Sequence, residues 1–181
     1  TRAEVLRDPF FYALLAGVLA PAFLGTTIFF HQDYLVNLRG YDPLAFAAAF
    51  PVMAASTVAF SLFCGQLIDR FGAIRVLPFF LLPLALASVT GALLEPVWGI
   101  YVFMLLLGVS YGLSSTLFGA LWPEVYGVKH LGAIRAVILS AIVVATALGP
   151  GLTGALIDRG IGIPQQLLWM AGWCLGASLL L

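Results

Sequence analysis

The sequence of residues 65–75 is Gly-Gln-Leu-Ile-Asp-Arg-Phe-Gly-Ala-Ile-Arg, a short charged segment between two long apolar runs. The run before it, residues 43–68, has no charged side chain, and neither has the run after it, residues 76–94. A helix rising about 1.5 Å per residue needs about 20 apolar residues to cross a hydrocarbon core of about 30 Å. The segment is therefore predicted to form the turn between two transmembrane helices.

The rest of the chain has the same character. Of the 181 residues, 62% are hydrophobic and 9% are charged, whereas a soluble domain has about 25% charged residues. This composition excludes a soluble enzyme and a disordered chain, and the zero net charge excludes a nucleic-acid partner. We predict an all-α integral membrane domain with six transmembrane helices, at about residues 9–33, 43–68, 76–94, 97–122, 133–157 and 164–181.

Basic residues in the loops predict the orientation, because lysine and arginine gather on the cytoplasmic side of a membrane. If each span crosses to the other side, one side holds only Arg39 and Arg159. The other side holds Arg2, Arg7, Arg70, Arg75, Lys129 and Arg135. Both ends of the segment are therefore expected in the cytoplasm, with the spans in the cell (inner) membrane.

Two short sequences recur along the chain. Residues 65–70, GQLIDR, return as GALIDR at residues 154–159, and GAIR occurs at residues 72–75 and 132–135. The first pair ends the second and the fifth span, which run in opposite directions. We interpret this as two three-helix repeats with inverted topology.

The segment at 65–75 resembles a signature of the major facilitator superfamily of secondary transporters, roughly Gly-x-Leu-x-Asp-Arg-x-Gly-Arg-Arg, found between the second and third helices of a six-helix half. Ala73 and Ile74 depart from it. Residues 149–154, GPGLTG, are similar to the Gly-Pro pattern in the fifth helix of antiporter members, and residues 7–10 resemble the entry to the seventh helix. The matching positions are Gly65, Leu67, Asp69, Arg70 and Gly72, with Arg75 at one later basic position.

This resemblance implies that the chain is the C-terminal half of such a transporter, helices seven to twelve, which moves a small solute by alternating access. Because the chain begins at Thr1 and ends within an apolar run, we expect the N-terminal half to be truncated, disordered or supplied by a second copy. The expected partners are the lipid bilayer, the solute and that missing half.

The resemblance also implies a conformational latch made of Gly65, Asp69, Arg70, Gly72 and Arg75; the alternative is a solvated turn that only anchors the second span. Helix breakers predict kinks or gates, although membrane helices also tolerate proline, as Pro78 and Pro83 indicate. The candidate gate residues are Pro21, Gly25, Gly149, Pro150 and Gly154. Pro51 is a further candidate kink, and Gly108 with Gly112 predicts close helix packing.

Polar side chains on the spans predict where a solute or proton binds, since they are poorly tolerated against lipid. His31 with Gln32 and Asp33 at the outer end of the first span is either a proton-coupling or solute-contacting group or a solvated loop cluster. Further candidates are Ser56, Thr57, Ser114, Ser115 and Thr146. We interpret Glu95, Glu124 and Lys129 as solvated loop charges.

Several functions stay open. Residues 29–32 with 123–132 resemble bacterial members near the monocarboxylate branch, so an organic acid is the first solute candidate, with coupling to a proton or exchange gradient. The alternatives are a drug or metabolite efflux antiporter and a non-transporting receptor or scaffold. No metal-ligand spacing, phosphate-binding loop or nucleophile beside a base is present in the sequence, so no catalytic residue, metal or cofactor is expected.

Overall fold

The structure, a computed structural model, describes residues 1–181 and consists of helices joined by short turns. In two helices, an aspartate caps the N-terminus and a proline follows it directly. Asp8 accepts a hydrogen bond from Phe10 N and Asp42 accepts one from Leu44 N, both at 2.9 Å. The helices are α1 (Arg2–Val5), α2 (Pro9–Phe30), α3 (Gln32–Arg39), α4 (Pro43–Ala48), α5 (Phe50–Phe71), α6 (Ala73–Val76), η1 (Leu77–Phe79), α7 (Leu82–Leu93), α8 (Trp98–Tyr126), α9 (Leu131–Asp158) and α10 (Ile163–Leu180).

Five helical segments are long and apolar enough to cross a membrane: Pro9–Phe30, Pro43–Phe71, Ala73–Leu93, Trp98–Tyr126 and Leu131–Asp158. These match the first five predicted spans. The sixth, α10, has 18 residues, but its first turn contains Pro164, Gln165 and Gln166, which lower its hydropathy. The all-helical membrane fold is confirmed, and the count of six spans stays a prediction.

Two of the predicted spans are interrupted. In the second, the helix pauses at Ala49, and Pro51 lies in the first turn of α5, where the missing N–H costs nothing. Pro51 therefore begins a helix instead of kinking one. In the third, Pro78 and Pro83 accompany a change from α6 through the 3₁₀ turn η1 to α7.

Helix packing follows the inverted repeat. The first three spans (α2, α4–α5, α6–α7) form one repeat, and α8, α9 and α10 form the other. The most extensive contacts join α5 to α8, α2 to α9, and α7 to α10. If the two repeats are exchanged, the α5–α8 contact becomes the α9–α2 contact, and the α7–α10 contact maps onto itself. An internal two-fold relation requires this pattern.

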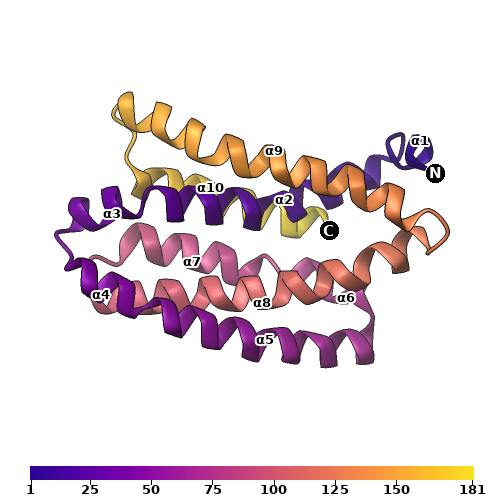
Figure 1. The fold of residues 1–181 in the computed structure, drawn as a ribbon, viewed down its shortest axis with the longest axis horizontal. Helices are drawn as coiled ribbons and strands as arrows, with labels where there is room; N and C mark the ends of the chain where they lie inside the picture. Colours follow the sequence, from indigo (N-terminus) through magenta and orange to yellow (C-terminus); the bar gives the residue numbers. More distant parts are fainter.

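The charged turns lie at the two ends of the bundle (Figure 1). Both termini share one end with the α5–α6 and α8–α9 turns, and the opposite end holds α3, α4 and the α7–α8 and α9–α10 connections. The segments that contain the six basic residues of the predicted inner side are the N-terminal end, the α5–α6 turn and the α8–α9 turn with the start of α9, and these share one end. The end of α3 and the α9–α10 connection, which contain Arg39 and Arg159, lie at the other. We call the end with α3 and α4 the outer end.

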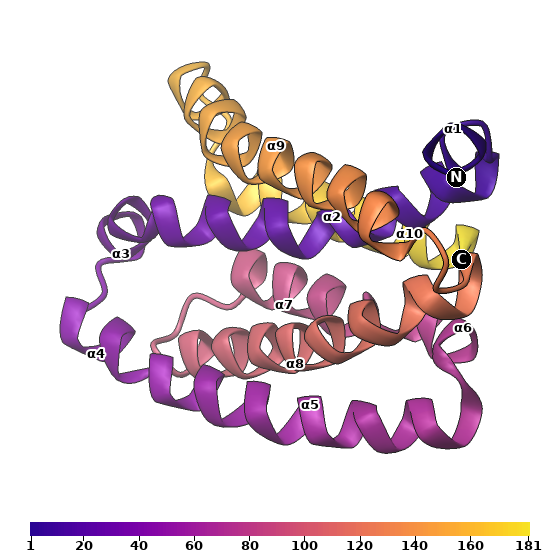
Figure 2. The same ribbon diagram turned by 45° about the vertical axis from the view of Figure 1, so that its right-hand side comes forward.

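Two helices lie at the edges of the bundle, α5 on one side and α9 on the other (Figure 2). Only 11% of the α4–α5 span and 17% of the α9 span is buried, against 50% or more of the spans of α2, α7 and α8. Both edge helices therefore have most of their surface outside the packed core of the bundle.

Candidate functional site

The largest open cavity lies between α2 and α9 and has a volume of about 840 Å³. Beside it the two helices approach closely, because a Cβ on Gly149 would lie 2.7 Å from Thr27 Oγ1 and 2.8 Å from Phe23 O. Only glycine permits this contact. The lining side chains include Thr26, Phe29 and Phe30 of α2 and Val143, Thr146 and Pro150 of α9.

The polar groups of this cavity are hydroxyls. Thr26 Oγ1 donates to Ala22 O at 2.8 Å and Thr146 Oγ1 donates to Val143 O at 2.7 Å, so both hydroxyls are held by their own helices. Their remaining lone pairs can accept hydrogen bonds. No charged side chain lines the cavity, so its chemistry is apolar with two weak acceptors.

An aromatic cluster lies beside this cavity and shares Phe29 with its lining. Phe29 stacks on Tyr111 of α8 with ring centroids 6.5 Å apart, and its ring lies 5.8 Å from that of Phe50 at the start of α5. The Tyr111 phenol packs against Gly25, a predicted gate residue. The cluster thus couples α2, α5 and α8 at the level of the cavity, and the sequence did not predict it because the three rings are far apart in the chain.

His31 lies at the end of α2, where its Nδ1 donates to Thr27 O at 3.0 Å. A carbonyl only accepts, so Nδ1 holds a proton and Nε2 is left free. Nε2 lies 3.8 Å from the Cβ position of Gly154, which brings His31 to the outer part of α9. Asp33 is exposed and forms no ion pair with His31, and Gln32 is half-buried.

The small polar candidates divide between two places. Ser56 and Thr57 both donate to Met53 O within α5, and they lie where α5 meets Gly108 and Gly112 of α8. The predicted close packing of these glycines is confirmed. Ser114 is buried and donates to Ser110 O, whereas Ser115 is exposed and donates to Gly112 O. Of the predicted cavity residues, Thr146 alone lines the α2–α9 cavity.

The latch candidates lie together at the inner end. Asp69 and Arg70 are exposed and form no ion pair, and the Arg70 guanidinium lies 5.2 Å from the centre of the Phe71 ring. Gly72 ends α5 with φ 83°, a conformation that favours glycine. Gly65 is half-buried and Arg75 is exposed. Asp69 therefore has no ion-pair partner within this bundle.

Glu124 corrects the sequence interpretation. Instead of being only a solvated loop charge, its carboxylate accepts hydrogen bonds from Ala73 N at 2.7 Å and Ile74 N at 3.4 Å. It also lies against Gly72. A carboxylate at the N-terminus of α6 accepts from free backbone N–H groups, and its negative charge interacts favourably with the positive end of the helix dipole. Glu124 thus attaches the end of α8 to the latch segment.

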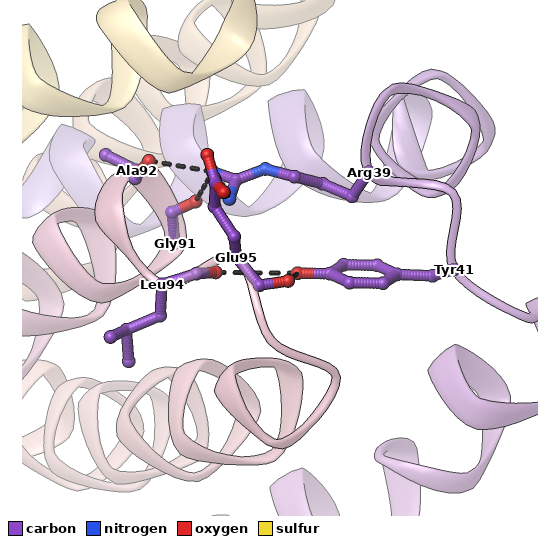
Figure 3. Close-up of polar contacts among 6 residues, drawn as sticks. All are labelled: Arg39, Tyr41, Gly91, Ala92, Leu94 and Glu95. Atoms are coloured by element: carbon purple, nitrogen blue, oxygen red, sulfur yellow. Dashed lines mark hydrogen bonds and ion pairs between the residues drawn. The ribbon is translucent and has the colours of Figure 1, made fainter.

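A buried arginine at the outer end was not predicted. Arg39, the last residue of α3, points its guanidinium at the C-terminus of α7 (Figure 3). Nη2 donates to Ala92 O at 2.7 Å and to Gly91 O at 3.2 Å. Its side chain is only 9% exposed, while Glu95, 4.0 Å away, is 85% exposed. The helix carbonyls are therefore its main partners.

Tyr41 adds a second contact to the same helix end. Its hydroxyl donates to Glu95 O at 2.6 Å and Leu94 O at 3.4 Å (Figure 3). Burial raises the pKa of the Tyr41 phenol; the Arg39 charge opposes this shift and the Glu95 carboxylate adds to it. The phenol therefore stays protonated and remains a donor. Together these side chains fix the α3–α4 connection to the α7–α8 turn.

The sequence profile of the Major Facilitator Superfamily matches residues 10–181. The chain belongs to the major facilitator superfamily. This is a family of transporters and not of enzymes, so the bundle is an integral membrane transporter domain without a catalytic role. A search of curated proteins finds no match to the sequence.

Proposed function

We propose that this major facilitator domain is one half of a secondary transporter that moves a small solute by alternating access, with the α2–α9 cavity as its solute-facing surface. The supporting observation is that cavity: about 840 Å³, lined by aromatic and aliphatic side chains with two threonine hydroxyls, between helices that contain Pro21, Gly25 and Pro150. Pockets for small molecules have this size and this mixture of apolar walls and few polar groups.

A second six-helix unit completes the transporter in this proposal. The exposed faces of α5 and α9 and the open cavity beside α9 are the surfaces it would cover. It is either the N-terminal half or a second copy of this chain. The helices α7 and α10 then face the lipid bilayer of the inner membrane, and both ends of the segment lie in the cytoplasm.

An organic acid is the proposed solute, and a proton or exchange gradient the proposed driving force. The cavity of this half has no cation to pair with a carboxylate, so the acid would be recognised through His31 when its Nε2 also holds a proton and can donate, or through the other half. The apolar lining also suits an amphipathic drug or metabolite, which keeps an efflux antiporter as the second candidate. A receptor or scaffold would show no solute flux.

The test is uptake by the full-length protein in proteoliposomes, with radiolabelled lactate as one probe and a fluorescent amphipathic cation as the other. Thr146→Val removes a cavity hydroxyl, and Ser140→Ala removes a hydroxyl from another face of α9. We expect Thr146→Val to raise the KM severalfold and Ser140→Ala to leave it unchanged. Equal effects of the two variants, or no flux of either probe, would contradict the proposal.

Proton coupling has its own test at His31. His31→Ala is expected to flatten the dependence of transport on external pH while solute exchange at fixed pH is damaged less, because exchange need not cycle the proton. An unchanged pH profile in a well-expressed variant would mean that His31 is a solvated residue without a role in proton coupling. The proton-coupling group would then lie in the other half.

A further inference from the structure

A groove follows the side of α9 that faces α10. Its outer part has a volume of about 280 Å³, and an adjoining part of about 440 Å³ continues toward the inner end. The two parts share Phe23 of α2 and Trp173 of α10. The groove exists because α9 contacts α10 much less than it contacts α2, which leaves α2 as the floor between them. None of its residues lines the solute cavity, which lies on another face of α9.

Two buried polar side chains in the outer part lack a partner for one oxygen each. Thr153 is 1% exposed and Gln166 is 2% exposed, and both line the groove. Thr153 Oγ1 and Gln166 Oε1 form no hydrogen bond, although Gln166 Nε2 donates to Ile161 O at 2.8 Å. Unpaired buried polar atoms are costly, so these oxygens indicate a ligand with polar groups at this depth.

The remaining lining has the chemistry of a lipid site. Arg159 lies at the outer rim, exposed and in no ion pair. The other walls are mainly apolar, and Trp169 and Trp173 flank them. Trp173 is held in place, since its Nε1 donates to Ala16 O of α2 at 3.1 Å.

The length of the outer part of the groove fits one acyl chain. One leaflet is about half of a hydrocarbon core of about 30 Å, so a chain covers about ten residues of a helix. Ten residues counted back along α9 from Arg159 reach Gly149. Gly149 is next to Leu148, where the inner part of the groove begins.

We infer that this groove binds one glycerophospholipid with an anionic head group. The phosphate pairs with Arg159, an ester carbonyl accepts a hydrogen bond from Thr153 Oγ1, and one acyl chain follows the apolar groove past Trp173. Gln166, which also lines the groove, accepts through its unpaired Oε1 from a water beneath the head group. The lipid then fills the gap between α9 and α10 and supports α9, the helix with the cavity on its other face.

The test uses native mass spectrometry of the full-length protein, with dioleoyl phosphatidylglycerol, its ether-linked analogue and dioleoyl phosphatidylcholine as probes. We expect one phosphatidylglycerol to be retained in preference to the other two. Arg159→Gln should weaken its retention about fivefold, the effect of one basic residue at a lipid surface. Arg75→Gln, an exposed arginine at the other end of the bundle, should have no effect.

Thr153→Val tests the ester contact without changing the side-chain shape. We expect it to abolish the preference for the ester over the ether lipid while lipid-free thermal stability stays equal or rises, because no partner within the chain is lost. Thr146→Val, the same change on another face of α9, should keep the preference. The inference is overturned if the wild type has no lipid preference, if Arg159→Gln and Arg75→Gln behave alike, or if Thr153→Val keeps the preference or lowers the stability.

Discussion

The hydroxyl of Tyr111 on α8 occupies the space that a side chain at Gly25 of α2 would need. A Cβ there would also lie 2.9 Å from Cζ of the tyrosine ring. Gly25 follows one turn after Pro21, whose missing N–H leaves the carbonyl of Gly17 without its helical hydrogen bond, so the phenol packs one turn beyond this break. This contact joins the first helices of the two repeats.

Gly25→Ala is expected to lower the thermal stability of the protein or to separate α2 from α8, because the added methyl group overlaps the Tyr111 hydroxyl. Overpacking of this kind costs about 1–3 kcal/mol. Thermal unfolding in detergent measures it. Tyr111→Phe in the same chain removes the overlapping oxygen and should restore part of the loss; a double variant no better than Gly25→Ala alone would contradict the contact.

Gly112→Ala tests the packing of α5 on α8. Its methyl group would lie 2.5 Å from Thr57 O and 2.8 Å from Ser61 N, both backbone atoms that cannot rotate away. We expect a fall in melting temperature and loss of the neighbouring Thr116 Oγ1 to Ser61 O hydrogen bond of 3.1 Å.

Gly119→Ala is the matched control on the same helix. No atom lies near its Cβ position, so helix propensity should stabilise it by up to about 1 kcal/mol. A stabilising effect of both substitutions would show that α5 and α8 are not in backbone contact.

The fold could be predicted well from the sequence because lipid imposes length and apolarity on each span. The charge-free runs predicted six spans, and five of them are helices long and apolar enough to cross a membrane. The two GAIR and two GxLIDR sequences predicted the repeat that the packing displays. The close approach at Gly108 and Gly112 was also predicted, since small residues four apart share a helix face.

The candidate site was less predictable, because its contacts join residues far apart in the chain. Ser56 and Thr57 were expected at the cavity, yet they lie between α5 and α8. Glu124 and Arg39 were assigned to loops because a single charge near a span end has no sequence feature that reveals its partner. Their partners are backbone groups of α6 and α7, which only the folded chain brings near.

Arg39→Gln is expected to destabilise the outer end of the bundle by about 2 kcal/mol, the scale of hydrogen bonds from a charged donor. A glutamine cannot supply the guanidinium charge to the α7 carbonyls. Glu95→Gln should cost less than about 1 kcal/mol, because its carboxylate is exposed and 4.0 Å from Arg39. Chemical unfolding compares them, and equal losses would mean that the ion pair, not the helix end, holds Arg39.

Asp69→Asn and Glu124→Ala separate latch function from local stability. Glu124→Ala removes the acceptor of two backbone N–H groups and should lower stability by about 1 kcal/mol. Asp69 has no partner in the bundle, so Asp69→Asn should leave stability unchanged while transport by the full-length protein falls sharply. Normal transport by Asp69→Asn would make it a solvated turn residue.

The most direct test of alternating access is the reaction of single cysteines with an impermeant thiol reagent, applied from outside to intact cells and from inside to inverted vesicles. Native Cys64 and Cys174 are first replaced. Thr146→Cys, halfway along α9 in the cavity, should react from both sides, and Leu148→Cys, on the groove face, from neither. Asn37→Cys should react only from outside and Arg75→Cys only from inside. Reaction of Thr146→Cys from one side alone, or from neither, would contradict the account.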